Sequence, residues 1–255
     1  MSKNFELMQE AFREMERGRS PVSDSGSLLF PRVEGIKAEG PGIADFDAAA
    51  QEECLRLVQR LFLSQAATSR RVVVFAGIDR GSGCSRVCLE SARILSANTS
   101  GPVCVVDANF RTPALSEFCG VPNHHGLADC LVEEGGIRSF AKCLPSANLW
   151  LLSAGALTAN SPGLLNSDRL KQRVQELRDE FQYVLIDVPA LNLYADAVAI
   201  GHIADGVVVV LHADSTRRES ALRGLECLKD AGVEVLGAVL NRRTFPIPEF
   251  VYRRL

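Results

Sequence analysis

The sequence has no apolar run that approaches the roughly 20 residues needed to span a bilayer. Its first eighteen residues are charged throughout and lack the apolar segment of a signal peptide. The eight cysteines include no C-x-x-C pair, and the four histidines show no metal-ligand spacing with them. These absences argue against a transmembrane segment, a structural zinc site and a disulfide framework, so we expect a cytoplasmic protein with reduced thiols.

The sequence also lacks a strong excess of charge of either sign. Lys and Arg number 28 and Asp and Glu 31, which gives a net charge of −3. The basic clusters are short (Arg217-Arg218, Arg242-Arg243 and Arg253-Arg254) and are interpreted as solvated surface. Composition therefore gives no reason to expect nucleic acid or an anionic membrane as a partner. With 47% hydrophobic and 23% charged residues, the chain is typical of globular proteins.

Four segments are predicted along the chain. Residues 1–18 form an amphipathic helix with apolar side chains on one face (Phe5, Met8, Phe12 and Met15). This apolar face could pack on the protein's own domain or dock to a partner, and the sequence favours neither alternative. Residues 19–44 are rich in Pro, Gly and Ser, as in a linker or extended arm. Residues 45–243 are predicted to form one domain, which a tail over 244–255 follows.

Within that domain, short β-branched runs alternate with helical segments. The predicted strands cover 72–76, 103–107, 149–153, 183–187, 206–211 and 235–241. The predicted helices cover 45–64, 85–97, 127–134, 167–180, 195–202 and 217–231. Nearly continuous apolar strands separated by helices favour a parallel sheet covered on both faces. The expected fold class is therefore α/β, with three layers, a mostly parallel central sheet and helices on both faces.

The loop after the first predicted strand has the composition of a phosphate site. It consists of Gly77-Ile78-Asp79-Arg80-Gly81-Ser82-Gly83-Cys84-Ser85-Arg86, and a helix begins near its end. The glycines at 81 and 83 permit positive φ values that let successive backbone N–H groups converge on an anion. The helix start adds a positive dipole, and Ser85 occupies the position of a Mg²⁺-ligating hydroxyl. A tight turn without a ligand is the alternative.

Two later strands end in carboxylates. Asp107 closes the run 103–107, and Asp187 closes the run 183–187. Ligands of parallel α/β sheets bind at the carboxyl ends of the strands, where a carboxylate beside a phosphate loop commonly holds a metal. Either aspartate alone is better explained as a helix cap. The pair, in this order behind a glycine-rich loop, favours a phosphate and metal site.

With these motifs in order, the region from about Glu53 to Arg243 resembles the cytosolic domain of the bacterial tyrosine kinases (BY-kinases), the partners of membrane polysaccharide co-polymerases. Residues 81–86 resemble their Walker A motif, residues 107–113 their Walker A′ and residues 185–189 their Walker B. Asn241 resembles their adenine-edge contact, with a loop-capping amide as the equal alternative. The resemblance implies a P-loop NTPase-like fold of the deviant Walker type, with ATP or ADP and Mg²⁺ as cofactors.

The resemblance also implies roles for individual residues. It makes Asp107 and Arg111 catalytic, and it assigns Mg²⁺ to Ser85, Asp107 and Asp187. The nucleotide contacts that it implies are Gly81, Ser82, Gly83, Cys84, Ser85, Arg86 and Asn241.

Three positions and the composition of the tail depart from the family pattern. Cys84 replaces the Walker A lysine, and Asn109 replaces the second acid of Walker A′. The helix motif that packs subunits of the family into a ring keeps Glu53 and Arg56 but has Gln59 in place of its last arginine. The tail has Tyr252 alone where the family usually has several tyrosines. A thiol is a poor donor and carries no charge, so loss of the lysine is expected to cost roughly 10²–10³ in transfer rate.

These features favour a kinase-like regulator of exopolysaccharide or capsule assembly that binds nucleotide weakly or not at all and has weak or absent phosphotransfer. It would dock to a membrane polysaccharide co-polymerase or a sibling kinase, lie at the inner membrane through that partner, and oligomerise through Glu53 and Arg56. The alternative is an active tyrosine autokinase that uses Arg80 or Arg86 as its cation and modifies Tyr252. A third candidate, a surface-positioning ATPase, is disfavoured because Asp79 stands where such proteins have an extra lysine.

Overall fold

The computed structural model describes residues 48–64, 70–145 and 148–243. The helix predicted over 1–18, the linker over 19–44 and the tail over 244–255 lie outside these residues. The strands are β1 (Val72–Gly77), β2 (Val103–Asp107), β3 (Lys142–Cys143), β4 (Leu149–Leu152), β5 (Tyr183–Val188), β6 (Val207–His212) and β7 (Val235–Asn241). The longer helices are α2 (Ala48–Val58), α3 (Cys84–Ala97), α8 (Asp168–Glu180), α9 (Asp196–Gly201) and α10 (Arg218–Asp230). Single turns form α4 (Leu115–Phe118), α5 (Leu127–Cys130), α6 (Ile137–Phe140) and α7 (Ser161–Leu164), and a π-helical turn, η1 (Gln59–Leu63), extends α2.

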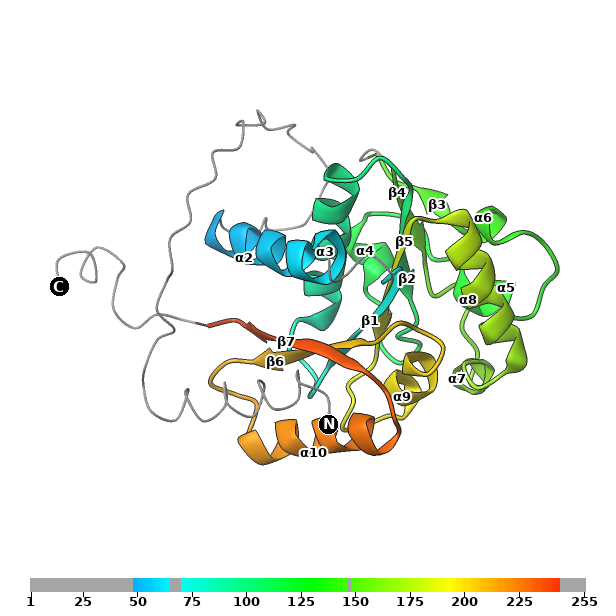
Figure 1. Cartoon of the computed structure of the whole chain (residues 1–255). Helices are drawn as coiled ribbons and strands as arrows, with labels where there is room; N and C mark the ends of the chain where they lie inside the picture. Colours follow the sequence, from blue (N-terminus) through cyan, green and yellow to red (C-terminus); the bar gives the residue numbers. More distant parts are fainter. Residues whose placement is uncertain (1–47, 65–69, 146–147, 244–255) are drawn as a thin grey trace, which may run out of the picture.

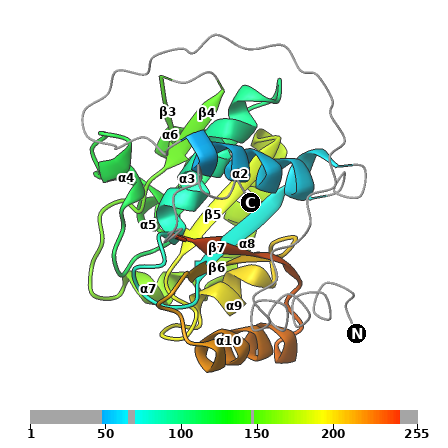
Figure 2. The ribbon, with the colours of Figure 1, turned by 90° about the vertical axis from the view of Figure 1, so that its left-hand side faces the viewer.

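The strands form one sheet in the order β3-β4-β2-β5-β1-β6-β7 (Figure 1). Every pairing is parallel except that of β3 with β4. Figure 2 shows β6 and β7 side by side above α10. The prediction of a mostly parallel sheet in a P-loop NTPase-like α/β fold is confirmed. In this order β1 lies between β5 and β6, so the loop that follows β1 lies beside the carboxyl ends of both neighbours.

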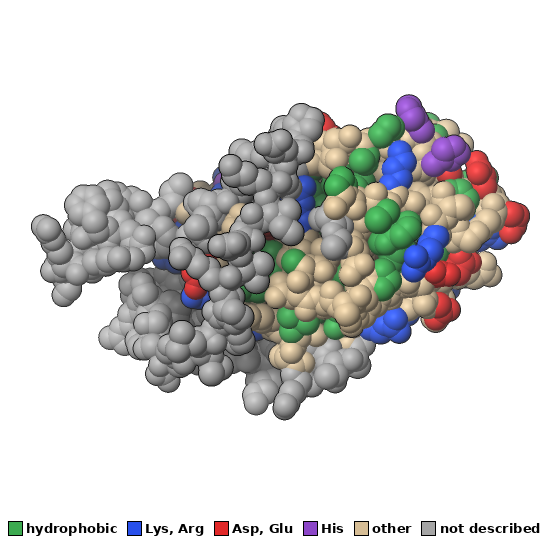
Figure 3. Space-filling model, turned by 90° about the horizontal axis from the view of Figure 1, so that it is seen from above, with side chains coloured by type: hydrophobic (Ala, Val, Ile, Leu, Met, Phe, Trp, Pro, Cys, Tyr) green, Lys and Arg blue, Asp and Glu red, His purple; other side chains and the backbone are tan. Residues whose placement is uncertain are grey.

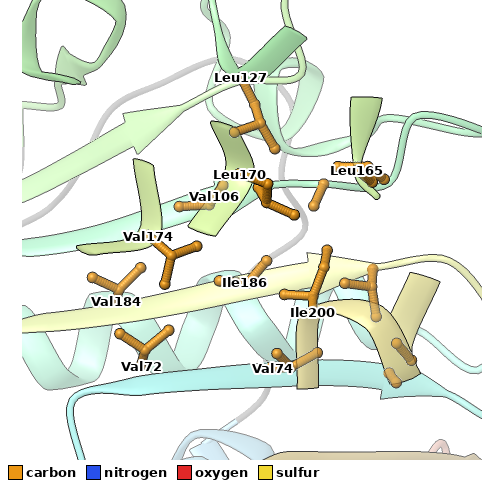
Figure 4. Packing of buried hydrophobic residues seen from close by; sticks show 14 of the residues in the cluster. Val72, Val74, Val106, Leu127, Leu165, Leu170, Val174, Val184, Ile186 and Ile200 are labelled. Carbon is orange, nitrogen blue, oxygen red and sulfur yellow. The ribbon is translucent and has the colours of Figure 1, made fainter. Parts of the chain in front are cut away.

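Helices cover both faces because the side chains of each strand alternate between two apolar clusters. On β1, Val72, Val74 and Ala76 pack into one cluster with side chains of α8, α9 and α10. Val73 and Phe75 point the other way, into the cluster formed with α2 and α3. Figure 4 shows the first cluster, where Val174 and Ile200 lie over the strands. Many of its large side chains, among them Phe181, Ile78 and Leu152, are fully buried.

Most predicted elements are confirmed to within one or two residues, and the differences have local causes. The helix predicted over 127–134 is shorter: α5 ends at Cys130. The buried guanidinium of Arg173 accounts for this, because it donates to the carbonyls of Cys130, Glu133 and Gly135. These carbonyls are thereby drawn toward α8, and the chain turns away from a helical path after one turn.

Asp205, two residues before β6, ties the start of β1 to α8. Its carboxylate accepts hydrogen bonds at 2.7 Å from the backbone N–H groups of Arg71 and Val72, at the start of β1. Arg178 of α8 donates to both of its oxygens, at 2.8 and 3.0 Å. Burial opposes ionisation here, but the bonds from Arg178, Val72 and Arg71 lower the pKa of Asp205 below its usual value. The carboxylate at this end of β1 therefore has hydrogen-bond donors for both of its oxygens.

Candidate nucleotide site

The glycine-rich loop runs from the end of β1 into α3 with the backbone that the sequence predicts. Gly81 has φ 80° and Gly83 has φ 79°, values that L side chains rarely adopt. Gly83 is the N-cap of α3, so the positive end of the helix faces the loop. A Cβ at Gly83 would collide with the side-chain amide of Asn241. Loop and helix start thus have the form of an anion-binding turn.

Asn241 ties the last strand to this loop. Its Nδ2 donates to the carbonyl of Ser82 at 2.8 Å, and its Oδ1 accepts from the backbone N–H of Arg242. The loop-capping alternative for Asn241 is therefore the contact that the structure has. Arg242 lies at the same place, with Nε 3.6 Å from where a Cβ of Gly83 would be.

Asp107 is fully buried at the end of β2, and backbone groups surround its carboxylate. One oxygen accepts from the N–H of Asn109 at 3.1 Å. The other accepts from the N–H groups of Ala114 and Leu115, each at 3.0 Å, at the start of α4. Burial raises the pKa of Asp107 to about 6, although these N–H groups lower it in part. The helix-capping role considered for this residue is therefore present in the structure.

Asp187 lies directly beside Asp107, because the two are register partners on β5 and β2. It is also fully buried, and no hydrogen bond of ordinary geometry reaches either of its carboxylate oxygens from the described residues. Burial and the neighbouring Asp107 raise the pKa of Asp187 well above its usual value. The Ser85 hydroxyl and the Cys84 thiol lie near enough to lower that pKa in part. Asp187 is thus a buried carboxylate whose charge has, in the described parts of the chain, no cation or well-formed hydrogen bond to offset the cost of its burial.

Cys84 occupies the first position of α3 and is buried, with 8% of its surface exposed. Burial and then the neighbouring Asp187 raise the pKa of its thiol well above 9.0. The thiol is therefore neutral at physiological pH, even though it lies at a helix N-terminus, where thiolates are usually favoured. The position of the family lysine thus supplies no positive charge to the loop.

The residues around Asp187 fit a Mg²⁺ ion that is also held by phosphate. Mg²⁺ prefers oxygen ligands and usually combines one or two carboxylates with phosphates and water. The carboxylate of Asp187 has no partner that satisfies it, and the Ser85 hydroxyl and Asp107 lie beside it. Within the described ranges, no group of three or more His, Cys, Asp or Glu side chains is arranged to hold a metal by itself. A cation here would need a phosphate ligand as well.

Two arginines from different loops meet at Tyr194, in the segment between β5 and α9. Nη2 of Arg80, in the glycine-rich loop, donates to the Tyr194 hydroxyl at 2.8 Å. The guanidinium of Arg111, in the segment after β2, lies 4.6 Å from the centre of the same ring. Asn192 of this segment donates to the carboxylate of Asp79. The segment after β5 therefore contacts both loops that carry the predicted site.

The structure brings most predicted site residues to one edge of the sheet. Gly81, Ser82, Gly83, Cys84 and Ser85 form the loop and the start of α3, between the strand ends that carry Asp187 and Asn241.

The remaining predicted residues are placed as follows. Arg86 is partly buried on the first turn of α3. Glu53 and Arg56 lie on the surface of α2, where Arg56 pairs with Glu53 at 2.7 Å and with Glu52 at 2.6 Å. The arginine of the ring motif is thus engaged within its own helix.

Sequence reasoning missed Tyr194 as a member of the site. The available signal was its position, seven residues after Asp187 at the carboxyl edge of the sheet. Asp196 was missed as well; it is buried, and one carboxylate oxygen has no hydrogen-bond partner among the residues described. Burial raises its pKa, and the nearby Arg111 lowers it in part.

No family model matches the chain. It is 27% identical to tyrosine-protein kinase YwqD of Bacillus subtilis (strain 168) over 189 residues, which are 69% of this chain and 79% of YwqD. It is 29% identical to tyrosine-protein kinase wzc of Salmonella typhi over 182 residues, which are 71% of this chain. The match covers only 25% of that relative, so the chain corresponds to about a quarter of its length.

Solved structures agree with the fold. The kinase domain of the Escherichia coli tyrosine kinase ETK matches with a TM-score of 0.70 at 22% identity, over 78% of this chain and 79% of that domain. The BceF tyrosine kinase domain matches with a TM-score of 0.67 at 26% identity, over 75% and 76%. A ParA family ATPase from Chlorobium tepidum TLS matches with a TM-score of 0.59 at 19% identity, over 68% and 75%.

Proposed function

Since this chain is a homologue of bacterial tyrosine kinases, we propose that it is a kinase-like regulator of exopolysaccharide or capsule assembly that binds a nucleotide–Mg²⁺ complex and transfers phosphate weakly or not at all. The observation that carries the proposal is the neutral, buried Cys84 in place of the Walker A lysine. The loop keeps the backbone geometry for phosphate, and Asp187 keeps an unsatisfied carboxylate for a metal. Binding elements are retained, whereas the charge for transfer is not.

The side chains of Asn109 and Asp107 are a second reason to expect weak phosphate transfer. The amide oxygen of Asn109, at the second acidic position of the motif, accepts from the backbone N–H of Thr112 at 3.1 Å. An amide cannot act as a general base. Asp107 is the remaining candidate base, but both of its oxygens already accept backbone N–H groups. A base in that arrangement would have to exchange these bonds to take a proton from a hydroxyl.

The proposed setting is the cytoplasmic face of a membrane, reached through a partner. None of the helices in the described parts of the chain is long and apolar enough to cross a bilayer. Figure 3 shows a face on which basic and acidic side chains are interspersed, which does not suggest a nucleic-acid surface. A membrane polysaccharide co-polymerase or a sibling kinase is the proposed partner, and self-association through Glu53 and Arg56 would require Arg56 to leave its partners on α2.

The direct test is phosphotransfer by the purified full chain with radiolabelled ATP and Mg²⁺, followed by detection of phosphotyrosine. We expect little or no label from the wild type. Cys84→Lys is expected to raise labelling by about 10²–10³-fold, because it restores the missing cation. Cys84→Ser is the matched neutral control and is expected to give no gain. Robust wild-type labelling that disappears in Asp107→Ala would contradict the proposal.

A second candidate function is an active tyrosine autokinase with a relocated cation. The contact of Arg80 with Tyr194 favours it, because Arg80 is a charged residue of the loop itself and this hydrogen bond holds its guanidinium at the carboxyl edge of the sheet. Its target, Tyr252, lies outside the described residues. The two candidates differ in one outcome: if the cation has moved, Cys84→Lys changes labelling little and Arg80→Met abolishes it. The positioning-ATPase alternative rests on fold likeness alone and is not proposed.

A further inference from the structure

Arg80 and Arg111 are placed as a pair although they come from different loops. The Tyr194 hydroxyl accepts from Arg80 at 2.8 Å, and the face of the same ring supports Arg111 at 4.6 Å from its centre. Two like charges gathered on one aromatic side chain repel each other. An anion placed between them would remove that repulsion and gain charge-assisted hydrogen bonds from both.

Neither arginine forms a close ion pair with a carboxylate among the described residues, although Asp196 lies near enough to Arg111 to interact with its charge. Other arginines of the domain pair at 2.6–2.8 Å: Arg138 with Glu180, Arg173 with Glu176 and Arg178 with Asp205. Arg80 and Arg111 form no such pair within 4.0 Å in the same parts of the chain. Both side chains belong to exposed residues, so they are accessible to a ligand.

The order of the strands gives the loop two different flanks. On one side, toward β5 and β2, lie Asp187, Asp107 and the arginine pair. On the other side, toward β6 and β7, lies the amide of Asn241. The charged flank, with an unsatisfied carboxylate for a cation and two exposed arginines, suits the phosphate end of a nucleotide, whereas both polar atoms of the Asn241 amide already have partners. This orientation brings the terminal phosphate toward Arg80 and Arg111.

We propose that Arg80 and Arg111 together bind the terminal phosphate of a nucleoside triphosphate in the loop, and that Tyr194 is the residue that positions them. The inference rests on the proposed nucleotide binding and extends it. It makes the chain a sensor that distinguishes triphosphate from diphosphate. A charge-assisted hydrogen bond to phosphate corresponds to a preference of about tenfold to a hundredfold.

Calorimetry on the full chain tests this with two probes, Mg²⁺–ADP and Mg²⁺ with the non-hydrolysable triphosphate AMP-PNP. The wild type is expected to bind AMP-PNP about tenfold to a hundredfold more tightly than ADP. Arg80→Met and Arg111→Met are each expected to lose most of this preference while ADP affinity stays within about twofold. Tyr194→Phe keeps the ring under Arg111 but removes the partner of Arg80, so it is expected to lose severalfold of the preference.

Two further variants serve as controls. Lys171→Met removes an exposed positive charge on α8 and is expected to leave both affinities unchanged. Arg242→Met removes the arginine beside Gly83; if it, and not Arg80→Met, abolishes the preference, the assignment is overturned. Equal wild-type affinity for both probes refutes the arginine pair while leaving nucleotide binding intact. Failure of both probes to bind refutes nucleotide binding and, with it, the sensor.

Discussion

Replacing Asp187 with asparagine is expected to stabilise the folded chain while weakening its binding of a nucleotide–Mg²⁺ complex. The carboxylate is fully buried and lies beside the equally buried Asp107. No hydrogen bond of ordinary geometry compensates its charge within the described residues. Asparagine has nearly the same shape without the charge, so the variant removes the electrostatic cost and leaves the packing in place.

The neighbouring carboxyl of Asp107 shows how large the cost of such burial is. Burial raises the pKa of Asp107 from 3.8 to about 6 even though three backbone N–H groups offset it. At about 1.4 kcal/mol per pKa unit, ionising such a group costs about 3 kcal/mol of folding free energy at pH 8 and roughly half as much at pH 5. Asp187 lacks comparable hydrogen bonds, and burial and the neighbouring Asp107 raise its pKa well above its usual value, so the cost of burying it has the same sign.

The sign follows from proton linkage. The folded chain holds the Asp187 proton more tightly than the unfolded chain, because its pKa is raised. Stability is therefore lost as pH rises above the unfolded value of about 4, and the loss grows until pH passes the folded pKa. The advantage of Asp187→Asn should be small near pH 4 and larger at pH 8 than at pH 5.

Urea unfolding of the wild type and the variant at pH 5 and pH 8, without nucleotide or Mg²⁺, measures the effect. Asp205→Asn is the matched control, because the pKa of Asp205 is lowered by its partners; this variant should lose stability at both pH values. A chain carrying Asp187→Asn that is no more stable than the wild type at pH 8, or whose advantage shrinks as pH rises, would refute the reasoning. Calorimetry with Mg²⁺–ADP should in turn show weaker binding by the variant.

Three further predictions concern the loop, the core and the thiol. Gly83→Ala should destabilise the chain by about 1–2 kcal/mol or more in thermal unfolding, because Gly83 has φ 79° and a Cβ there would collide with the side-chain amide of Asn241. The control is Gly163→Ala, which should be neutral or stabilising because a Cβ at Gly163 meets nothing within 4 Å. Arg173→Met should lower unfolding free energy by about 2–4 kcal/mol in urea, because it strands three carbonyls that this buried side chain satisfies; a change below about 0.5 kcal/mol would show that water replaces it. Cys84 should react with an alkylating reagent at pH 7 far more slowly than the exposed Cys143, since burial raises its pKa; fast modification of Cys84, followed by mass spectrometry, would instead support a redox role.

The sheet and its strand ends could be predicted because each strand is a short β-branched run, and such runs carry their own signal. Asp107 and Asp187 follow directly from where those runs stop. The choice between cap and metal ligand could not be made from sequence, because both roles require the same residue at the same place. It depends on where the segment after β2 folds back, and there the N–H groups of Ala114 and Leu115 reach Asp107 but none reaches Asp187.

The contacts of long polar side chains could not be predicted from the sequence. Arg173 lies in a helix with a polar composition, where an arginine usually faces solvent, yet it is only 2% exposed. Tyr194 gathers Arg80 and Arg111 from loops that lie 114 and 83 positions away. The direction of a flexible side chain is set by tertiary packing and leaves no local pattern. One-turn helices such as α4 and α6 are likewise too short for a period to show.

The bond network around Asp205 has a consequence for how the protein can change. At the amino ends of the strands, ionised groups contribute favourably to folding, whereas the buried carboxylates at the carboxyl ends oppose it. Substitutions near Asp205 should thus be selected against because they destabilise the fold, while those near Asp187 can raise stability and at the same time abolish ligand binding. A screen that selects only for thermal stability would therefore tend to enrich variants that no longer bind their ligand, because the substitutions that stabilise this fold lie at the ligand site.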